Sequence, residues 1–267
     1  MISVTDWLAL RHNVLLDAQR IEMYNPSYWD REACVINENM PHWVELTDKQ
    51  LKKLPLSSEI TVLDVGAGTG RLTLPMAKYV KHVTALEPSK NMLSILKDTA
   101  KKQGISNISF INAPLEELDT ISNSYDLVVA SFSLFMLDIE SALIKMNTLA
   151  AKGVYLFMSA SPWIDENIQK AVNGNLSSWS DFVFICHILH DLNILTNIDL
   201  CDYELKQNYA NFDAALSKLS QINHIPPEKM SLLREYLHTN LAEENGNLWY
   251  NRRRKAATIW WNTNKAL

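Results

Sequence analysis

Short apolar runs alternate with amphipathic stretches between residues 60 and 160. Five runs are four to six residues long, as in buried parallel strands, and they cover 61–65, 82–86, 108–111, 125–130 and 153–158. The stretches between them carry apolar residues at helical spacing, as in Leu72, Met76 and Val80. Strands that alternate with helices predict an α/β fold with a doubly wound parallel sheet and helices on both faces.

The pattern is less regular on either side of this core. Beyond residue 160 it predicts helices near 164–171, 179–195, 212–222 and 228–241, and strands at 198–205 and 255–261, which makes seven strands in all. An amphipathic helix is expected over 5–18, before Pro26 interrupts helical structure. We therefore expect an N-terminal helical lid segment over 1–55, a sheet core over 56–160 and a remainder over 161–267 with helical insertions, all within one domain.

A dense glycine pattern follows the first apolar run. Gly66, Gly68 and Gly70 alternate with other residues, directly before an amphipathic stretch. Glycine is used where the backbone takes left-handed dihedral angles or where a ligand must approach closely. Dinucleotide-binding loops space their glycines as Gly-x-Gly-x-x-Gly, whereas here the third glycine comes one residue early. The loop therefore predicts a nucleotide-like cofactor other than a dinucleotide.

The order Asp-x-Gly-x-Gly-x-Gly, from Asp64 to Gly70, resembles the first motif of the class I S-adenosylmethionine (SAM) methyltransferases. The resemblance implies SAM as the cofactor and a Rossmann-like sheet of seven strands whose last strand is antiparallel. It also implies that Ala67 and the three glycines line the cofactor site, and that Asp64 orients the methionine part of SAM.

The ends of the next predicted strands carry matching chemistry. Glu87 lies about 20 positions beyond the loop, where a carboxylate can accept hydrogen bonds from both ribose hydroxyls. Ser89 is expected to cap the following helix. Asn112 stands where the family usually has an acidic residue against the adenine amino group, and its amide oxygen can accept the same bond. The complete predicted cofactor set is Asp64, Gly66, Ala67, Gly68, Gly70, Glu87, Pro88, Ser89, Met92, Asn112, Ala113, Pro114, Leu115 and Ser131.

Two segments bear on the methyl acceptor. Residues 131–138 lack the Asn/Asp-Pro-Pro-aromatic run of enzymes that methylate adenine or glutamine amides, and they resemble the short apolar turn of quinone-biosynthesis and other small-molecule methyltransferases. Tyr28, Trp29 and Asp30 are similar to a segment that folds over the cofactor as a lid in many of these enzymes. The alternative is that these aromatic residues only pack the N-terminal helices onto the core.

Methyl transfer needs no conspicuous catalytic motif, because holding donor and acceptor in line supplies about 7–11 kcal/mol of barrier reduction. Tyr28, His187 and His190 are the candidates for a pocket role. The two histidines are three residues apart in a strongly apolar stretch, where packing or capping is the ordinary use, and we expect no bound metal. The basic run 251–255 can hold a phosphate or carboxylate, contact RNA, or form a solvated edge.

Composition narrows the remaining choices. The 267 residues carry a net charge of −5, so no general basic field exists to collect nucleic acid. Three distant cysteines, an N-terminus without a secretory signal and the lack of a membrane-spanning run favour a cytoplasmic protein. We expect a SAM-dependent methyltransferase that acts on a small molecule. The alternatives are a non-catalytic SAM-binding regulatory module and an RNA or protein methyltransferase, and oligomeric state leaves no signal in the sequence.

Overall fold

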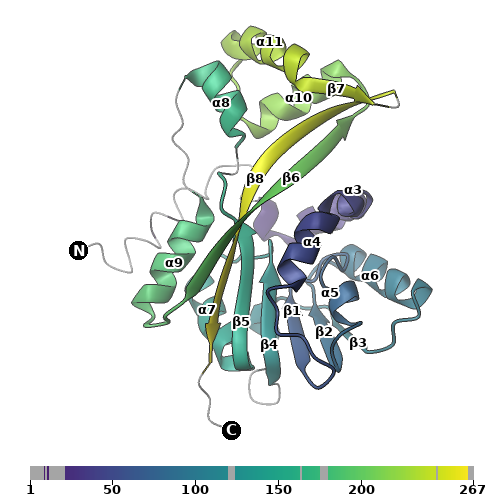
Figure 1. Cartoon of the computed structure of the whole chain (residues 1–267), viewed down its shortest axis with the longest axis vertical. Helices are drawn as coiled ribbons and strands as arrows, with labels where there is room; N and C mark the ends of the chain where they lie inside the picture. The colour runs from purple at the N-terminus through teal and green to yellow at the C-terminus, as the bar shows by residue number, and fades with distance from the viewer. Residues whose placement is uncertain are drawn as a thin grey trace. The chain divides into compact units, whose positions relative to one another are not determined.

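A central sheet organises the computed structural model, which describes residues 9, 11, 22–119, 124–162, 164–174, 180–244 and 246–263 (Figure 1). Within these residues the strand order is β3-β2-β1-β4-β5-β8-β6, and β7 pairs with β8. The strands are β1 (Thr61–Val65), β2 (His82–Leu86), β3 (Ile108–Ile111), β4 (Tyr125–Ser131), β5 (Ala150–Ser159), β6 (Asn197–Tyr209), β7 (Leu241–Glu244) and β8 (Asn247–Asn262). The prediction of a seven-stranded α/β sheet is confirmed, and β7 adds an eighth strand.

Helices occupy the connections and the N-terminal part of the chain. They are η1 (Glu22–Tyr24), α3 (Pro26–Asn39), η2 (Met40–Trp43), α4 (Val44–Leu51), α5 (Thr73–Met76), α6 (Lys90–Lys102), η3 (Leu115–Glu117), α7 (Ile139–Leu149), α8 (Glu166–Asn173), α9 (Asp181–Asp191), α10 (Phe212–Ile222), η4 (Pro227–Lys229) and α11 (Met230–Asn240). Ser89 caps α6 as predicted, because its Oγ accepts a hydrogen bond of 3.2 Å from the Met92 amide. No helix among these is long and apolar enough to cross a bilayer.

Successive residues of β1 face opposite sides of the sheet. Leu63 belongs to a buried cluster with α7 and α9, which includes Leu143 and Ile185. Val62 belongs to a second buried cluster with α5 and α6, which includes Leu96. Both faces of the parallel strands are therefore covered by helices, which explains why β1 is apolar without alternation.

The parallel register aligns the ends of three strands. Val65 of β1 lies opposite Leu86 of β2 on one side and opposite Ala130 of β4 on the other. The strand order reverses at β1 and β4, and in open α/β sheets ligands bind beyond the carboxyl ends at such a point. The residues that follow these three strands are therefore the first place to search for a site.

By its internal packing the chain divides into two compact units. The first contains residues 1–158, 182–200 and 257–267, and the second contains 159–181 and 201–256. The second unit has its own buried cluster, to which α8, α10, α11 and β8 contribute Ile168, Leu219, Leu237 and Tyr250. Strands β6 and β8 each supply residues to both units. The expectation of one domain overall stays a prediction.

Several boundaries differ from the sequence prediction. β8 begins at Asn247 instead of 255, β6 continues to Tyr209 instead of 205, and the hairpin partner β7 was not predicted. The sequence pattern did not reveal the start of β8, because one of the buried positions of this strand holds the charged Arg252. α5 ends at Met76 instead of near 80, and α9 ends at Asp191 instead of 195. Of the helix predicted over 5–18, only residues 9 and 11 lie within the described residues.

Candidate functional site

The three glycines after β1 serve different purposes. All have positive φ, at 71° for Gly66, 56° for Gly68 and 99° for Gly70. A Cβ on Gly66 would lie 2.3 Å from Ser133 Cβ, and one on Gly70 would lie 2.3 Å from Leu96 Cδ1, so both positions are required by the packing of the chain itself. A Cβ on Gly68 would meet only a sulfur atom at 3.8 Å. Gly68 is thus the loop glycine with room for a further atom beside its Cα, where a ligand can approach the backbone.

Glu87 joins the end of β2 to this loop. Its Oε2 accepts a hydrogen bond of 2.8 Å from the Gly68 amide, and its Oε1 accepts one of 2.8 Å from the Ser89 amide. The residue is buried, and burial raises the pKa of its carboxyl against the lowering effect of these two amides. Each oxygen keeps a further lone pair, so the carboxylate can still accept hydrogen bonds from two ligand hydroxyls.

Asp64, at the end of β1, points into the protein. It is 2% exposed and its Oδ2 accepts a hydrogen bond of 2.6 Å from Thr73 Oγ1. Burial raises the pKa of Asp64 to about 6, while the Thr73 hydroxyl and the Arg71 charge act in the opposite direction. The Asp64 carboxylate therefore fixes the loop to the start of α5.

Two buried polar groups near the loop lack partners among the described residues. Thr69 Oγ1, within the loop, has none, and neither the amide nitrogen nor the amide oxygen of Gln50 has one. Gln50 lies one turn beyond Thr47 on α4, and Thr47 Oγ1 accepts a hydrogen bond of 2.9 Å from Arg71 directly after the loop. Buried polar groups are almost always satisfied. These donors and acceptors fit a ligand that carries polar groups of both kinds.

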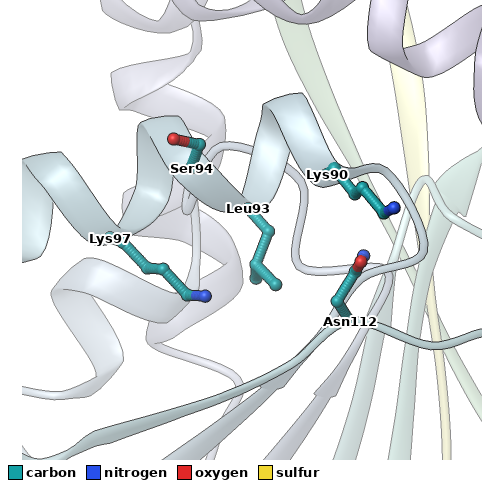
Figure 2. Close-up of a pocket in the computed structure, with 5 residues that line it drawn as sticks. All are labelled: Lys90, Leu93, Ser94, Lys97 and Asn112. Atoms are coloured by element: carbon teal, nitrogen blue, oxygen red, sulfur yellow. The ribbon is translucent and has the colours of Figure 1, made fainter.

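Asn112 directly follows β3, and its side chain holds the turn after β2 by hydrogen bonds. Its Nδ2 donates hydrogen bonds of 2.9 Å to the carbonyl oxygens of both Glu87 and Pro88, which leaves its amide oxygen for other partners. A pocket of about 140 Å³ lies between this side chain and Lys90, Leu93, Ser94 and Lys97 of α6. Figure 2 shows these five residues. That volume is below the range of about 300–1,000 Å³ typical of ligand sites. The glycine loop takes no part in this pocket, so we do not assign the cofactor to it.

The N-terminal helices pack onto the same strand ends. Asp30 on α3 accepts hydrogen bonds at Oδ1 from Ser89 Oγ, at 2.6 Å, and from the Asn91 amide, at 3.0 Å. The Ser89 hydrogen bond is the main cause that lowers the pKa of Asp30. The neighbouring Trp29 ring lies 5.1 Å from the Phe135 ring in the segment that follows β4. Helix α3 is thereby attached both to the first turn of α6 and to the β4 segment.

Arg71, directly after the glycine loop, attaches the N-terminal helices to the strand ends at a second place. Its guanidinium donates to Thr47 Oγ1 of α4 and to Ser131 Oγ at the end of β4. The same group lies 5.6 Å from the ring centroids of both Trp43 and Phe132. Phe132 has a φ of 52°, which is unusual for a residue other than glycine and is typical of constrained sites. Sequence reasoning placed Asp30 in the lid segment without a partner and missed Arg71 as a site residue, because the contacts of both join segments far apart in the chain. It also missed Thr69, which lies within the glycine loop itself.

The structure brings most of the predicted site residues to one edge of the sheet. Asp64 and Ser131 lie at the ends of β1 and β4, the glycine loop follows β1, and Glu87 and Ser89 follow β2. Met92 approaches Gly68. Leu115 is buried among core residues, and Ala113 packs against the same cluster. Tyr28 is half-buried on α3, with its ring 5.0 Å from that of Trp29.

The two histidine candidates lie elsewhere. His187 and His190 are exposed on α9, whose buried residues Ile185, Ile188 and Leu189 pack toward the sheet. The side chain of His190 is 78% exposed, and its Nδ1 lies 3.5 Å from Asp191 Oδ1. The structure does not bring these imidazoles to the glycine loop, so neither is included in the site.

Comparisons with known proteins find a methyltransferase domain within the chain. Residues 62–153 match a family model described as a methyltransferase domain. An uncharacterized protein from Haemophilus influenzae is 24% identical over 251 residues, which cover 90% of each chain. A demethylmenaquinone methyltransferase from Listeria welshimeri is 32% identical over 116 residues, which cover 42% of this chain and 48% of that enzyme. The chain thus aligns with about half the length of that curated relative.

A solved structure supports the fold. A putative methyltransferase from Bacillus halodurans superimposes with a TM-score of 0.53 at 14% identity, covering 81% of this chain and 98% of that one. Together with the sheet order and the glycine loop, the match identifies residues 62–153 as a class I SAM-dependent methyltransferase domain, and the cofactor of such a domain is SAM.

Proposed function

We propose that this protein transfers a methyl group from SAM to a small-molecule acceptor. The observation that carries the acceptor class is the packing of α3 and η2 onto the segment after β4, where Trp29 lies against Phe135 and Trp43 lies against Phe132. That segment is the one whose sequence resembles the short apolar turn of small-molecule methyltransferases. An acceptor side covered by aromatic rings suits a small, largely apolar molecule better than a polymer, and the net charge of −5 also disfavours RNA.

The strand ends suggest how the chain would hold the cofactor. Glu87 would accept hydrogen bonds from the two ribose hydroxyls, and the open side of Gly68 would let the ligand approach the backbone. The oxygen of Asn112 would accept from the adenine amino group, while Thr69 and Gln50 would gain partners from the amino-acid end. The predicted role of Asp64 is modified: because its carboxylate is bonded to Thr73, it would orient the methionine part only through the loop.

SAM supplies a methyl group on a sulfonium, whose loss leaves a neutral thioether. The protein then has to position the acceptor and exclude water, which lowers the barrier by about 7–11 kcal/mol. Trp29, Trp43 and the phenylalanines they contact can exclude water from this side. Burial, helped by the negative charges of Glu32 and Glu22, raises the pKa of Tyr28. Tyr28 therefore keeps its proton at neutral pH and can donate a hydrogen bond to the acceptor, but it is a poor general base.

Transfer of labelled methyl groups tests this proposal. The protein is incubated with SAM labelled on the methyl carbon and with three fractions of a cell extract: metabolites below about 1 kDa, RNA, and protein. We expect label in the metabolite fraction, and at SAM concentrations below saturation we expect it to fall by about 30-fold with Glu87→Gln. Label confined to RNA or protein would contradict the acceptor class. Binding of SAM without transfer to any fraction would favour the regulatory alternative. A cytoplasmic location remains a prediction.

A further inference from the structure

The second unit contains a buried polar cluster that methyl transfer does not explain. Asp165 caps α8, because its Oδ1 accepts hydrogen bonds of 2.9 Å and 3.1 Å from the amides of Asn167 and Ile168. Its Oδ2 accepts one of 3.1 Å from the hydroxyl of Tyr250, which lies 3.1 Å from the hydroxyl of Tyr236. Asp165 is 5% exposed and Tyr250 is 2% exposed. This carboxylate therefore uses both oxygens within the unit.

Arg252 enters the same cluster from β8 and is incompletely paired. It is 6% exposed, and its Nη2 donates a hydrogen bond of 2.8 Å to Gln207 Oε1. Its Nε lies 3.7 Å from Asp165 Oδ2, which is within ion-pair range but is not a hydrogen bond. Nε and Nη1 have no hydrogen-bond partner among the described residues and are shielded from solvent. Three of the five guanidinium hydrogens are thus available.

Arg254 lies two residues further on, so its side chain is on the same face of β8 as that of Arg252. Its Nη2 donates to Ser159 Oγ at 3.2 Å and to the carbonyl oxygens of Ser161 and Pro162, while its Nε has no partner among the described residues. Burial lowers the pKa of Arg254, and the charge of Arg252 acts in the same direction. Arg254 is only partly buried, which gives the cluster access to solvent on its side.

The charges of the buried cluster indicate which kind of ligand it can bind. Two guanidinium groups face one buried carboxylate, that of Asp165, whereas the nearby Glu166 is exposed to solvent, so the buried part of the cluster keeps an excess of one positive charge. A monoanion balances this excess, whereas a phosphate dianion would bring an extra negative charge close to Asp165. The planar guanidinium also matches the two oxygens of a carboxylate. We propose that the Arg252–Arg254 cluster of the second unit binds a carboxylate group of a small molecule.

Thermal unfolding of the full chain in sodium acetate, with sodium chloride of equal ionic strength as the reference, tests the proposal. Binding to the folded state raises Tm, and we expect acetate near saturation to raise it by about 3 °C. The shift should disappear in Arg252→Gln and Arg254→Gln and persist in Arg253→Gln, because Arg253 is exposed on the opposite face of β8. Inorganic phosphate at the same ionic strength should give a smaller shift.

If the Arg252–Arg254 cluster only stabilises the second unit and binds no ligand, the melting temperatures should respond differently. In that case acetate would produce no shift beyond chloride in the natural protein, or an equal shift in all three variants, and either result would overturn the proposal. If Arg252→Gln fails to fold, Arg254→Lys takes its place, since lysine keeps the charge but loses the planar fork. Broadening of the ¹³C-acetate signal should then occur with the natural protein and Arg253→Gln, and be lost with Arg254→Lys. Broadening retained in Arg254→Lys would count against the proposal.

A kinetic comparison identifies the source of the carboxylate. If it belongs to the methyl acceptor, Arg254→Gln should raise the acceptor KM by tenfold or more and leave the affinity for S-adenosylhomocysteine unchanged. If it belongs to a separate small acid, the acceptor KM should stay the same while acetate binding is still lost. The KM comparison depends on the proposed function, whereas the acetate measurement does not. A failure of methyl transfer therefore leaves the carboxylate site independently testable.

Discussion

Glu87 accepts a 2.8 Å hydrogen bond at Oε2 from the amide of Gly68, which joins the end of β2 to the loop after β1. Gly68 is also the loop glycine with room for a further atom beside its Cα. The carboxylate offered to a ribose therefore also holds the backbone that the ligand would approach. Because one residue does both, changes at Glu87 should affect loop conformation and ligand affinity together.

Replacing Glu87 with glutamine should weaken cofactor binding. The amide keeps one acceptor oxygen, but its NH₂ group would face the backbone amide of Gly68 or Ser89, which needs an acceptor. We expect affinity for S-adenosylhomocysteine to fall by about 30-fold, or about 2 kcal/mol, measured by calorimetry. Glu59→Gln, at an exposed position before β1, is the matched control and should bind normally. Unchanged affinity in Glu87→Gln would remove this residue from the site.

The loop glycines should separate stability from binding when each is replaced by alanine. Gly66→Ala forces a 2.3 Å contact with Ser133 Cβ and should lower the free energy of unfolding by about 3 kcal/mol or more. Gly68→Ala adds only the cost of a positive φ, about 1–2 kcal/mol, but should abolish SAM binding. Gly104→Ala also has a positive φ, at 68°, and no atom within 4 Å of the added Cβ, so it controls for backbone strain. Urea unfolding and calorimetry measure the two effects, and normal SAM binding by Gly68→Ala would contradict the model of the site.

Removal of the Arg71 side-chain charge should loosen α4. Arg71→Met loses hydrogen bonds to Thr47 and Ser131 and its contacts with the rings of Trp43 and Phe132, each ring contact being worth about 0.5–1 kcal/mol. Hydrogen exchange in residues 44–51 should become about tenfold faster or more, while exchange in β1 stays unchanged. Arg31→Met, which removes an exposed arginine of α3, should leave α4 protected. Equal exchange in the two variants would show that Arg71 does not hold the helix.

Asp64 should make stability depend on pH in a weakly acidic range. Its pKa of about 6 in the folded protein lies above its ordinary value of 3.8, so the folded state binds the proton more tightly. The free energy of unfolding should therefore fall as pH rises from about 4 to about 6, by on the order of 2–3 kcal/mol. Asp64→Asn should lack this part of the profile, whereas Asp98→Asn, at an exposed position of α6, should retain it. Parallel profiles for the natural protein and Asp64→Asn in urea titrations would refute this account.

The sheet core was predictable because its signals are local. Each of β1 to β4 is a short apolar run bounded by turn residues. Ser89 marks the start of α6 because it caps the helix through the amide of Met92, three residues further on. The residues at strand ends then followed from topology alone, since parallel strands bring their carboxyl ends to one edge. This is why Glu87 and the glycine loop could be placed beside each other from sequence.

The rest depended on contacts between distant segments. Asp30 and Ser89 are 59 residues apart, and Arg71 and Ser131 are 60 apart, so no periodicity connects them. The basic run 251–255, in the middle of β8, could be an anion site, an RNA contact or a solvated edge by sequence alone, because arginine counts as polar in any pattern. Only the partners of Arg252, which include Gln207 on β6, make that position an inward-facing one.

The hydrogen bonds from Ser89 Oγ and the Asn91 amide to Asp30 fasten α3 within a few residues of Glu87. A ligand that immobilises this turn must also slow the detachment of α3, and by thermodynamic reciprocity whatever holds α3 in place strengthens ligand binding. Arg31 is exposed within α3, so its rate of cleavage by trypsin should report how far the nearby strand ends are occupied, without any label on the ligand.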